Sequence, residues 1–320
     1  LKISRLKPRI HVECFLLLAA CARTRTRSMD HGLRQRSEPS KSPAASRKHP
    51  LDTDDRLRGS LWGLFIADAL ASPTHWFYGG SSQVVRDYPG GIRGYRQPNM
   101  ECEASIMNKS NTGGGGRGLY EEGNIIGEVI NHGKKPYWCP GKSFHYHCTL
   151  AEGENTLEAQ LVRVLMRSIS AGSGRFDATD FREQYVAFMT TPGSHNDCYA
   201  SSCHRIFFAN YARGVPPQKC PGNDGHNVDT VDGLVLPTIV ALCAASLPRL
   251  EADALVKLAV RVTRNSPALE EYAVVWNGLL RAVLQGQNVK RAVLTACHAC
   301  PALSSIAREA AIGRFDAVVS

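Results

Sequence analysis

The chain has 320 residues, of which 43% are hydrophobic and 21% charged, as in globular proteins large enough to bury a substantial core. Its net charge of +9 lies entirely in residues 1–50, which hold 12 Lys and Arg against three acids, so the other 270 residues hold 26 of each sign. The body therefore carries no general basic field, and we expect no nucleic acid among its partners.

Residues 1–50 form a basic segment that precedes the predicted domain. An apolar run at 14–22 is too short to cross a bilayer, and 23–50 is rich in Arg, Ser and Pro. These features fit an organellar transit peptide, a disordered tail, or a chain that starts at Met29. We expect an intracellular protein, cytoplasmic or organellar, with no membrane partner and with its eleven cysteines reduced.

Residues 51–320 are predicted to form one helical domain. A cap at Asp52 begins a helix that stops before Pro73. Asp68 interrupts the apolar face of this helix, so it either faces solvent or is functional, because a buried carboxylate needs a partner. The aromatic run at 75–78 either lines a cleft or belongs to the core.

The stretch from Gly79 to Gly141 is rich in glycine and has few apolar periods, which predicts a long insertion of loops. At its centre four glycines stand between Lys109 and Arg117. Their backbone N–H groups can cradle a phosphate, and the alternative is a plain flexible loop. The four are Gly113, Gly114, Gly115 and Gly116.

Residues 151–169 open with acid, amide and hydroxyl side chains and then show one apolar helical stripe. Thr156 or Asn155 can cap the first turn, where Glu158 is also favoured by the unpaired N–H groups. The same oxygen-rich start suits a hard cation, so a capped core helix and a metal half-site both remain open. The stripe comprises Leu157, Leu161, Val164, Leu165 and Ser168.

A second acidic helix entrance follows at 223–233, before an apolar helix over 234–247. Asp229 and Asp232 lie on the same side of its first turn. If this entrance faces that of Thr156 and Glu158 across a cleft, the two can hold one or two Mg²⁺ ions, and the alternative is again helix capping.

Further amphipathic helices are predicted from the apolar periodicity, and no strand-turn-strand signature interrupts them. His195, Asn196 and Asp197 form a polar group that can cap the helix after it, recognise a ligand, or do both. The body is therefore expected to be all-α. The further helices begin near residues 176, 203, 251, 267 and 289.

Four stretches together resemble the ADP-ribosylglycohydrolase superfamily, in a branch near the J1-type crystallins. They are Gly59–Leu70, Pro73–Tyr78, Gly153–Gln160 and Thr263–Ala268. The resemblance covers roughly residues 55–320. Two departures stand out: Leu157 replaces an expected Asp, and no Gly-Gly-Asp-x-Asp type metal motif follows residue 300. The chain is therefore expected either to be incomplete at its C-terminus or to have rebuilt its site.

The resemblance implies an orthogonal helical bundle that hydrolyses an ADP-ribosyl glycosidic or ester bond with the help of up to two Mg²⁺ ions. It implies Glu158 and Asp229 as catalytic residues, and an ADP-ribosylated substrate or an ADP-ribose-like small molecule as the partner. The implied metal ligands are Thr156, Glu158, Asp229 and Asp232. The implied substrate contacts are His75, Gly113, Gly114, Gly115, Gly116, His195 and Asn196. The competing hypothesis is a non-catalytic, crystallin-like structural or ligand-binding member of the same fold.

Overall fold

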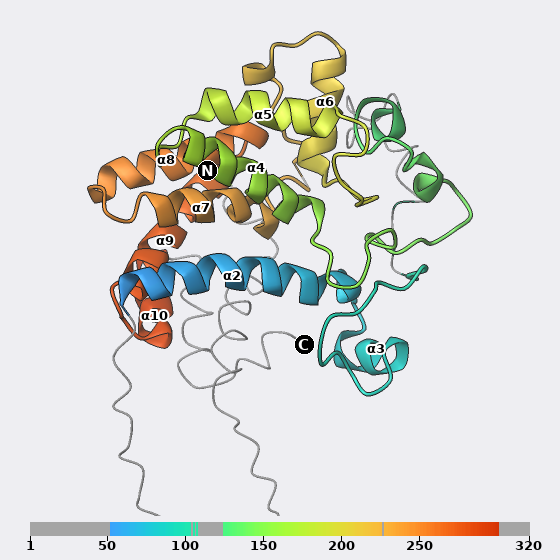
Figure 1. The fold of residues 1–320 in the computed structure, drawn as a ribbon, viewed down its shortest axis with the longest axis horizontal. Helices are drawn as coiled ribbons and strands as arrows, with labels where there is room; N and C mark the ends of the chain where they lie inside the picture. The colour runs from blue at the N-terminus through green and yellow to red at the C-terminus, as the bar shows by residue number, and fades with distance from the viewer. Residues whose placement is uncertain (1–51, 104, 106, 108–123, 226, 301–320) are drawn as a thin grey trace, which may run out of the picture.

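The computed structural model describes residues 52–103, 105, 107, 124–225 and 227–300, and throughout this part the fold is all-α, as predicted (Figure 1). The extended pairings among these residues are two isolated bridges, Glu101 with Phe144 and Ile126 with Ile130. No helix in the described part is both long enough and apolar enough to cross a membrane. The predictions for residues 1–50 and for Gly113–Gly116 lie outside the described residues.

Helices of eight or more residues account for most of the described chain, joined by short helical turns and loops. The helices are α2 (Thr53–Ala71), α3 (Gly80–Asp87), α4 (Leu157–Ala171), α5 (Ala178–Thr190), α6 (Ser202–Ala212), α7 (Val235–Cys243), α8 (Arg249–Thr263), α9 (Pro267–Leu284) and α10 (Val289–Ala299). The short turns are η1 (Ser72–Thr74), η4 (Ile125–Val129), η5 (Lys135–Trp138), η6 (Pro217–Lys219) and η7 (Val231–Leu234).

The helices α7, α8 and α9 pack against one another, and α4 packs against both α5 and α7. The helix α2 runs across this group and contacts α4 and α9 (Figure 1). The predicted apolar stripe of α4 is buried at every position, from Leu157 to Ser168, which confirms the periodicity. The helix α4 therefore lies between α2 and the helices α5 and α7.

Local capping explains where several helices begin. Asp52 accepts a hydrogen bond from the Asp55 N–H at 2.7 Å, and Ser266 accepts one from the Leu269 N–H at 3.1 Å. Asp177 accepts from the N–H groups of Thr179 and Asp180 at 2.7 and 3.2 Å. The start at Asp52 agrees with the prediction, and in all three helices the cap residue satisfies N–H groups that have no partner within the helix.

We expect Asp177→Ala to lower the free energy of unfolding by about 1 kcal/mol, because the first turn of α5 loses its side-chain acceptor. Asp177→Asn is the matched control, since the amide oxygen still accepts and the loss stays within a few tenths of a kcal/mol. Denaturant unfolding followed by circular dichroism measures both. Equal losses in the two variants would contradict the capping role.

Two predicted elements differ from the structure. The loop predicted from Gly79 onward begins with the helix α3, in which the Gln83 side chain turns back to accept from the Gly79 N–H at 3.0 Å. This side-chain bond stabilises a start that has no ordinary cap residue. The helix predicted over 234–247 is shorter in the structure, where α7 follows η7 and ends at Cys243.

Candidate functional site

Two carboxylates from distant parts of the chain meet at the N-terminus of α4. Asp68 of α2 accepts from the Thr156 N–H at 2.9 Å and from the Thr156 hydroxyl at 2.6 Å. Asp197, from the loop before α6, accepts from the Leu157 N–H at 2.9 Å. Negative charge at this position is favoured because the unpaired N–H groups of the first turn carry partial positive charge.

This arrangement changes the predicted role of Thr156. Thr156 occupies the cap position of the backbone, but its hydroxyl donates to Asp68 and makes no cap bond of its own. Asn155 likewise donates to Asp68, at 2.9 Å. Burial raises the pKa of Asp68, and the hydrogen bonds from Thr156 and Asn155 oppose this rise. Asp68 is therefore neither solvent-facing nor unpaired: it ties α2 to α4.

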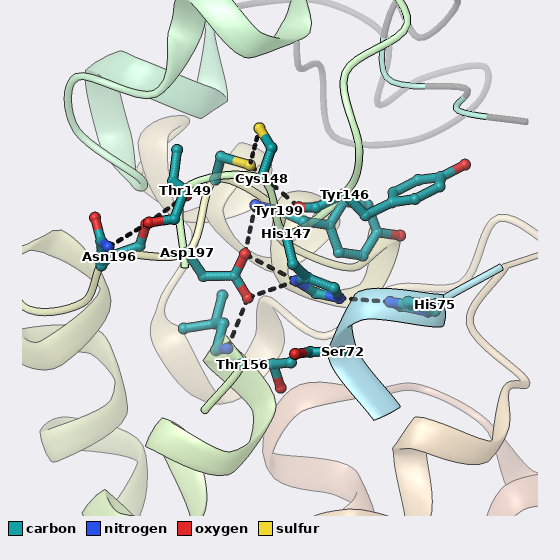
Figure 2. A network of polar contacts seen from close by, with 12 residues as sticks. Ser72, His75, Tyr146, His147, Cys148, Thr149, Thr156, Asn196, Asp197 and Tyr199 are labelled. Atoms are coloured by element: carbon teal, nitrogen blue, oxygen red, sulfur yellow. Dashed lines mark hydrogen bonds and ion pairs between the residues drawn. The ribbon is translucent and has the colours of Figure 1, made fainter. Parts of the chain in front are cut away.

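Asp197 also holds a pair of histidines in line. Both of its carboxylate oxygens lie 3.0 Å from Nδ1 of His147, and Nε2 of His147 lies 2.5 Å from Nδ1 of His75 (Figure 2). The two imidazole rings are close to coplanar, at 14°. Asp197 and His147 are buried, at 1% and 3% exposure, whereas His75 is half-buried. The result is a chain of hydrogen-bonding groups that leads from a buried carboxylate outward to His75.

The protonation states of Asp197, His147 and His75 are set by their burial and by the charges of their neighbours. Burial works to raise the pKa of Asp197, but His147 and two backbone N–H groups hold it below its usual value. Burial works to lower the pKa of His147, but Asp197 raises it above 6.5 overall. Burial and the charge of His147 lower the pKa of His75 to about 3, so His75 itself stays neutral near pH 7.

An aromatic cage surrounds His75. Its ring lies 4.6 Å from that of Trp76 and 6.2 Å from that of Tyr199, between centroids. Trp76 also packs edge-on against Tyr146 at 4.1 Å. Trp76 adopts a φ of +59°, a left-handed conformation that is uncommon for a bulky residue and that accumulates at functional sites. The predicted aromatic run therefore supports both the core and the position of His75.

The pH dependence of stability tests the ion pair of His147 with Asp197. The raised pKa of His147 stabilises the fold fully below pH 6.5, and this contribution is lost as the pH rises through the raised value. The lowered pKa of Asp197 stabilises the fold above about pH 4, and this contribution is lost as the pH falls further. We therefore expect the contribution of the pair to be largest between about pH 4 and 6.5.

The measurement is the free energy of unfolding of the wild type and of His147→Gln at pH 5.5 and pH 8.5. The lowered pKa values of His75 and His145, about 3 and 4, act in the opposite direction, so the difference between wild type and variant is the informative quantity. We expect this difference to shrink at the higher pH. A difference that grows with pH would show that His147 is not a charged partner of Asp197.

A second polar network lies on the first turn of α4. Oε1 of Glu158 accepts from Nε2 of His204 at 2.9 Å and from the Ser201 hydroxyl at 3.0 Å. Nδ1 of His204 lies 2.8 Å from the Tyr185 hydroxyl. Burial works to lower the pKa of His204, but neighbouring Cys203, Tyr185 and Glu158 raise it well above its usual value. Glu158 thus faces α6 and has a fixed basic partner.

The acids of the second predicted half-site have partners of their own. Asp232 accepts from the guanidinium of Arg264 at 2.6 Å, and Asp229 accepts from the Asn223 side chain at 3.1 Å. Burial works to raise the pKa of Asp232, but Arg264 holds it below its usual value. Glu158 also contributes to the field at Arg264, so the structure brings Glu158 and Asp232 to the surroundings of one cation. The expected proximity of Glu158 to Asp229 stays a prediction.

The predicted substrate residues fall in different surroundings. His75 is the outer member of the histidine chain. His195 stacks on Phe188 at 5.8 Å, and its buried Nδ1 has no hydrogen-bond partner among the residues that the structure describes. Asn196 donates to the Thr149 carbonyl and accepts from Lys134 at 3.0 Å, so it ties neighbouring loops together. None of His195, Asn196 and Asp197, the predicted cap residues, caps α6, whose cap position is Ser201. The contacts of His75, His195 and Asn196 with substrate stay a prediction.

Sequence reasoning did not identify the pair of His147 and Asp197. Each residue lies in a recognisable polar group, 145–147 and 195–197, but 50 positions separate them and neither pattern points to the other. Only packing places the two groups side by side. One hint in the sequence is that His147 and Asp197 each stand next to apolar residues.

The residues do not fit the predicted Mg²⁺ site. Among the residues that the structure describes, no group of three or more His, Cys, Asp and Glu is arranged to hold a metal ion. The Thr156 hydroxyl donates to Asp68, and the carboxylates of Glu158 and Asp232 already accept from buried cationic or donor groups. A Mg²⁺ ion requires oxygen atoms free to converge at about 2.1 Å. The ion and its ligands therefore stay a prediction.

One of the three comparisons with known proteins gives a match. The sequence profile described as ADP-ribosylglycohydrolase matches residues 49–319. No curated protein and no solved structure matches the chain.

Proposed function

Because this chain belongs to the ADP-ribosylglycohydrolase family, we propose that it hydrolyses an ADP-ribosyl linkage, with His75 as the base that activates water. The observation that carries the proposal is the hydrogen-bonded chain from Asp197 through His147 to the half-buried His75. A general base must reach the attacking water and must be able to keep the proton that it takes. The partner implied by the family is an ADP-ribosylated substrate.

The tautomers of the chain follow from its acceptor. Asp197 accepts from Nδ1–H of His147, so a neutral His147 presents a lone pair at Nε2. His75 then donates its Nδ1–H to that lone pair and presents its own lone pair at Nε2. The outer nitrogen of His75 is therefore the atom that accepts a proton from water.

The hydrogen-bonded chain also compensates for the low pKa of His75, which makes this residue a weak base. With its pKa lowered to about 3 by burial and by the charge of His147, His75 alone would not hold a proton near pH 7. When Nε2 of His75 takes a proton from water, its Nδ1 proton can pass to Nε2 of His147. The positive charge then resides on His147 beside Asp197, where the pKa of the imidazole is raised. The water oxygen bonds to C1″, the ribose carbon of the hydrolysed linkage, as the bond to the leaving group breaks. The leaving group takes a proton from solvent, and His147 returns its extra proton through His75 to solvent.

The proposal makes the rate depend on the protonation of His147. The hydrogen-bonded chain accepts a proton only while His147 is neutral. The rate of hydrolysis should therefore rise with pH through the raised pKa of His147. The test is release of ADP-ribose from arginine-, serine- and O-acetyl-linked substrates, measured by chromatography across this pH range in buffer with EDTA and in buffer with Mg²⁺. Release from none of the three in either buffer would contradict the hydrolase proposal.

One observation favours the non-catalytic alternative. Thr156, Glu158 and Asp232 are all engaged by partners within the protein, as expected if an ancestral site now serves the fold. A crystallin-like or ligand-binding member would bind free ADP-ribose without turning over any linkage, or bind nothing. Calorimetry with ADP-ribose, run beside the release assay, separates these outcomes from catalysis.

A further inference from the structure

A buried arginine contacts the acidic segment 223–233, for which the sequence predicts either metal binding or helix capping. The side chain of Arg264, which directly follows α8, is only 2% exposed. One terminal nitrogen donates to Asp232 at 2.6 Å, and the other donates to the Val228 carbonyl at 2.8 Å and the Thr230 hydroxyl at 3.1 Å. All of these acceptors lie within residues 228–232, so the segment wraps around the guanidinium.

The Arg264 guanidinium also interacts electrostatically with Glu158, which belongs to the other predicted half-site. Burial works to lower the pKa of Arg264, but Asp232, Cys203 and Glu158 raise it above its usual value, so the group keeps its charge. Asp232 comes from η7 and Glu158 from the first turn of α4. This cation pairs directly with Asp232 of one acidic helix entrance, and Glu158 of the other entrance contributes to its field.

Backbone shape holds the arginine in place. A Cβ atom added at Gly233 would lie 2.2 Å from Cδ2 of Leu269, 3.0 Å from Nε of Arg264 and 3.1 Å from Cδ of Arg264. Only a residue without a side chain allows η7 to approach Arg264 and α9 this closely. The ion pair is thus built into the packing, unlike a mobile surface salt bridge.

We propose that Arg264 is the built-in cation of this acidic site and replaces a divalent metal ion there. A divalent cation and a buried guanidinium that share Asp232 would repel each other, and the carboxylate oxygen nearest Arg264 already has a partner. Unlike a metal ion, an arginine cannot bind and ionise water, which leaves that step to His75. The proposal concerns cation binding alone, so it stands or falls independently of the hydrolase activity.

The test compares the EDTA-dialysed wild type with Arg264→Met and Arg264→Lys, each with and without 10 mM Mg²⁺, an amount chosen to saturate weak sites. Arg264→Met leaves Asp232 without its cation and opens space beside it. We expect Mg²⁺ to raise the melting temperature of Arg264→Met by roughly 5 °C and to leave the wild type and Arg264→Lys within about 1 °C. Adding Asp232→Asn to Arg264→Met should abolish the response.

Equilibrium dialysis of the wild type against Mg²⁺ tests the proposal without any variant. We expect less than one tenth of an ion per chain, and an Arg264→Met chain that folds only with Mg²⁺ would support the proposal equally. Stoichiometric binding by the wild type that Asp232→Asn removes would overturn it. A folded Arg264→Met that ignores Mg²⁺ would also overturn it, as would an Arg264→Lys chain that gains the same response as Arg264→Met.

Discussion

Replacing Asp197 with alanine is expected to lower the free energy of unfolding by about 3–5 kcal/mol, the loss typical when one partner of a buried ion pair is removed. Asp197 is 1% exposed and accepts from His147, from the Leu157 N–H and from the Tyr199 N–H. Its removal leaves a buried imidazole and two backbone donors without their acceptor. Denaturant unfolding monitored by tryptophan fluorescence measures the loss.

Two companion variants show whether the buried charge is the cause. Asp197→Asn keeps an acceptor of similar shape and should cost roughly 1–3 kcal/mol. Glu271→Gln breaks the exposed ion pair with Lys257 and should change the stability by less than about 0.5 kcal/mol. An Asp197→Ala loss no larger than that of Glu271→Gln would refute the view that Asp197 holds this region together.

Replacing His75 with phenylalanine is expected to lower kcat by about 10²- to 10⁴-fold on the linkage that the release assay identifies. Phenylalanine keeps the aromatic contacts with Trp76 and Tyr199 but cannot accept a proton. Because the aromatic shape remains, KM should change little, whereas the buried Nε2 of His147 loses its partner, which should lower the free energy of unfolding by about 1–3 kcal/mol. Steady-state kinetics near the optimum pH measure the two constants separately.

The control for this variant is His132→Gln. His132 is half-buried, and its Nε2 contacts the Thr190 carbonyl at 3.1 Å, away from the chain that begins at Asp197. We expect wild-type kcat for His132→Gln. Wild-type kcat in His75→Phe would remove His75 from the mechanism, whereas an increase in KM alone would show that it only binds substrate.

Much of the fold was predictable because its signals are local. The stripe of α4 and the caps at Asp52, Asp177 and Ser266 depend on residues three or four positions apart, and all appear in the structure. The helix α3 was missed because its first turn is stabilised by the Gln83 side chain, which no cap pattern announces.

The candidate site was predictable only in part, because its contacts join distant segments. Glu158 and Asp232 do lie near one cation, but that cation is Arg264, which the sequence showed only as part of a turn between helices. The pairing of Asp68 with Thr156 spans 88 positions and that of His147 with Asp197 spans 50. Capping and metal binding use the same acids, so the sequence could not distinguish a cap supplied from another helix from a metal ligand.

The position of one proton on His75 decides whether this residue can act as the base. ¹⁵N NMR of a histidine-labelled wild-type chain reports which ring nitrogens of His75 and His147 carry hydrogen as the pH is raised. Above the raised pKa of His147, we expect His75 to carry its proton on Nδ1, bonded to Nε2 of His147, and to leave its outer Nε2 bare. A His75 that keeps its proton on Nε2 throughout the titration would contradict the proposed role, because it could not accept a proton from water.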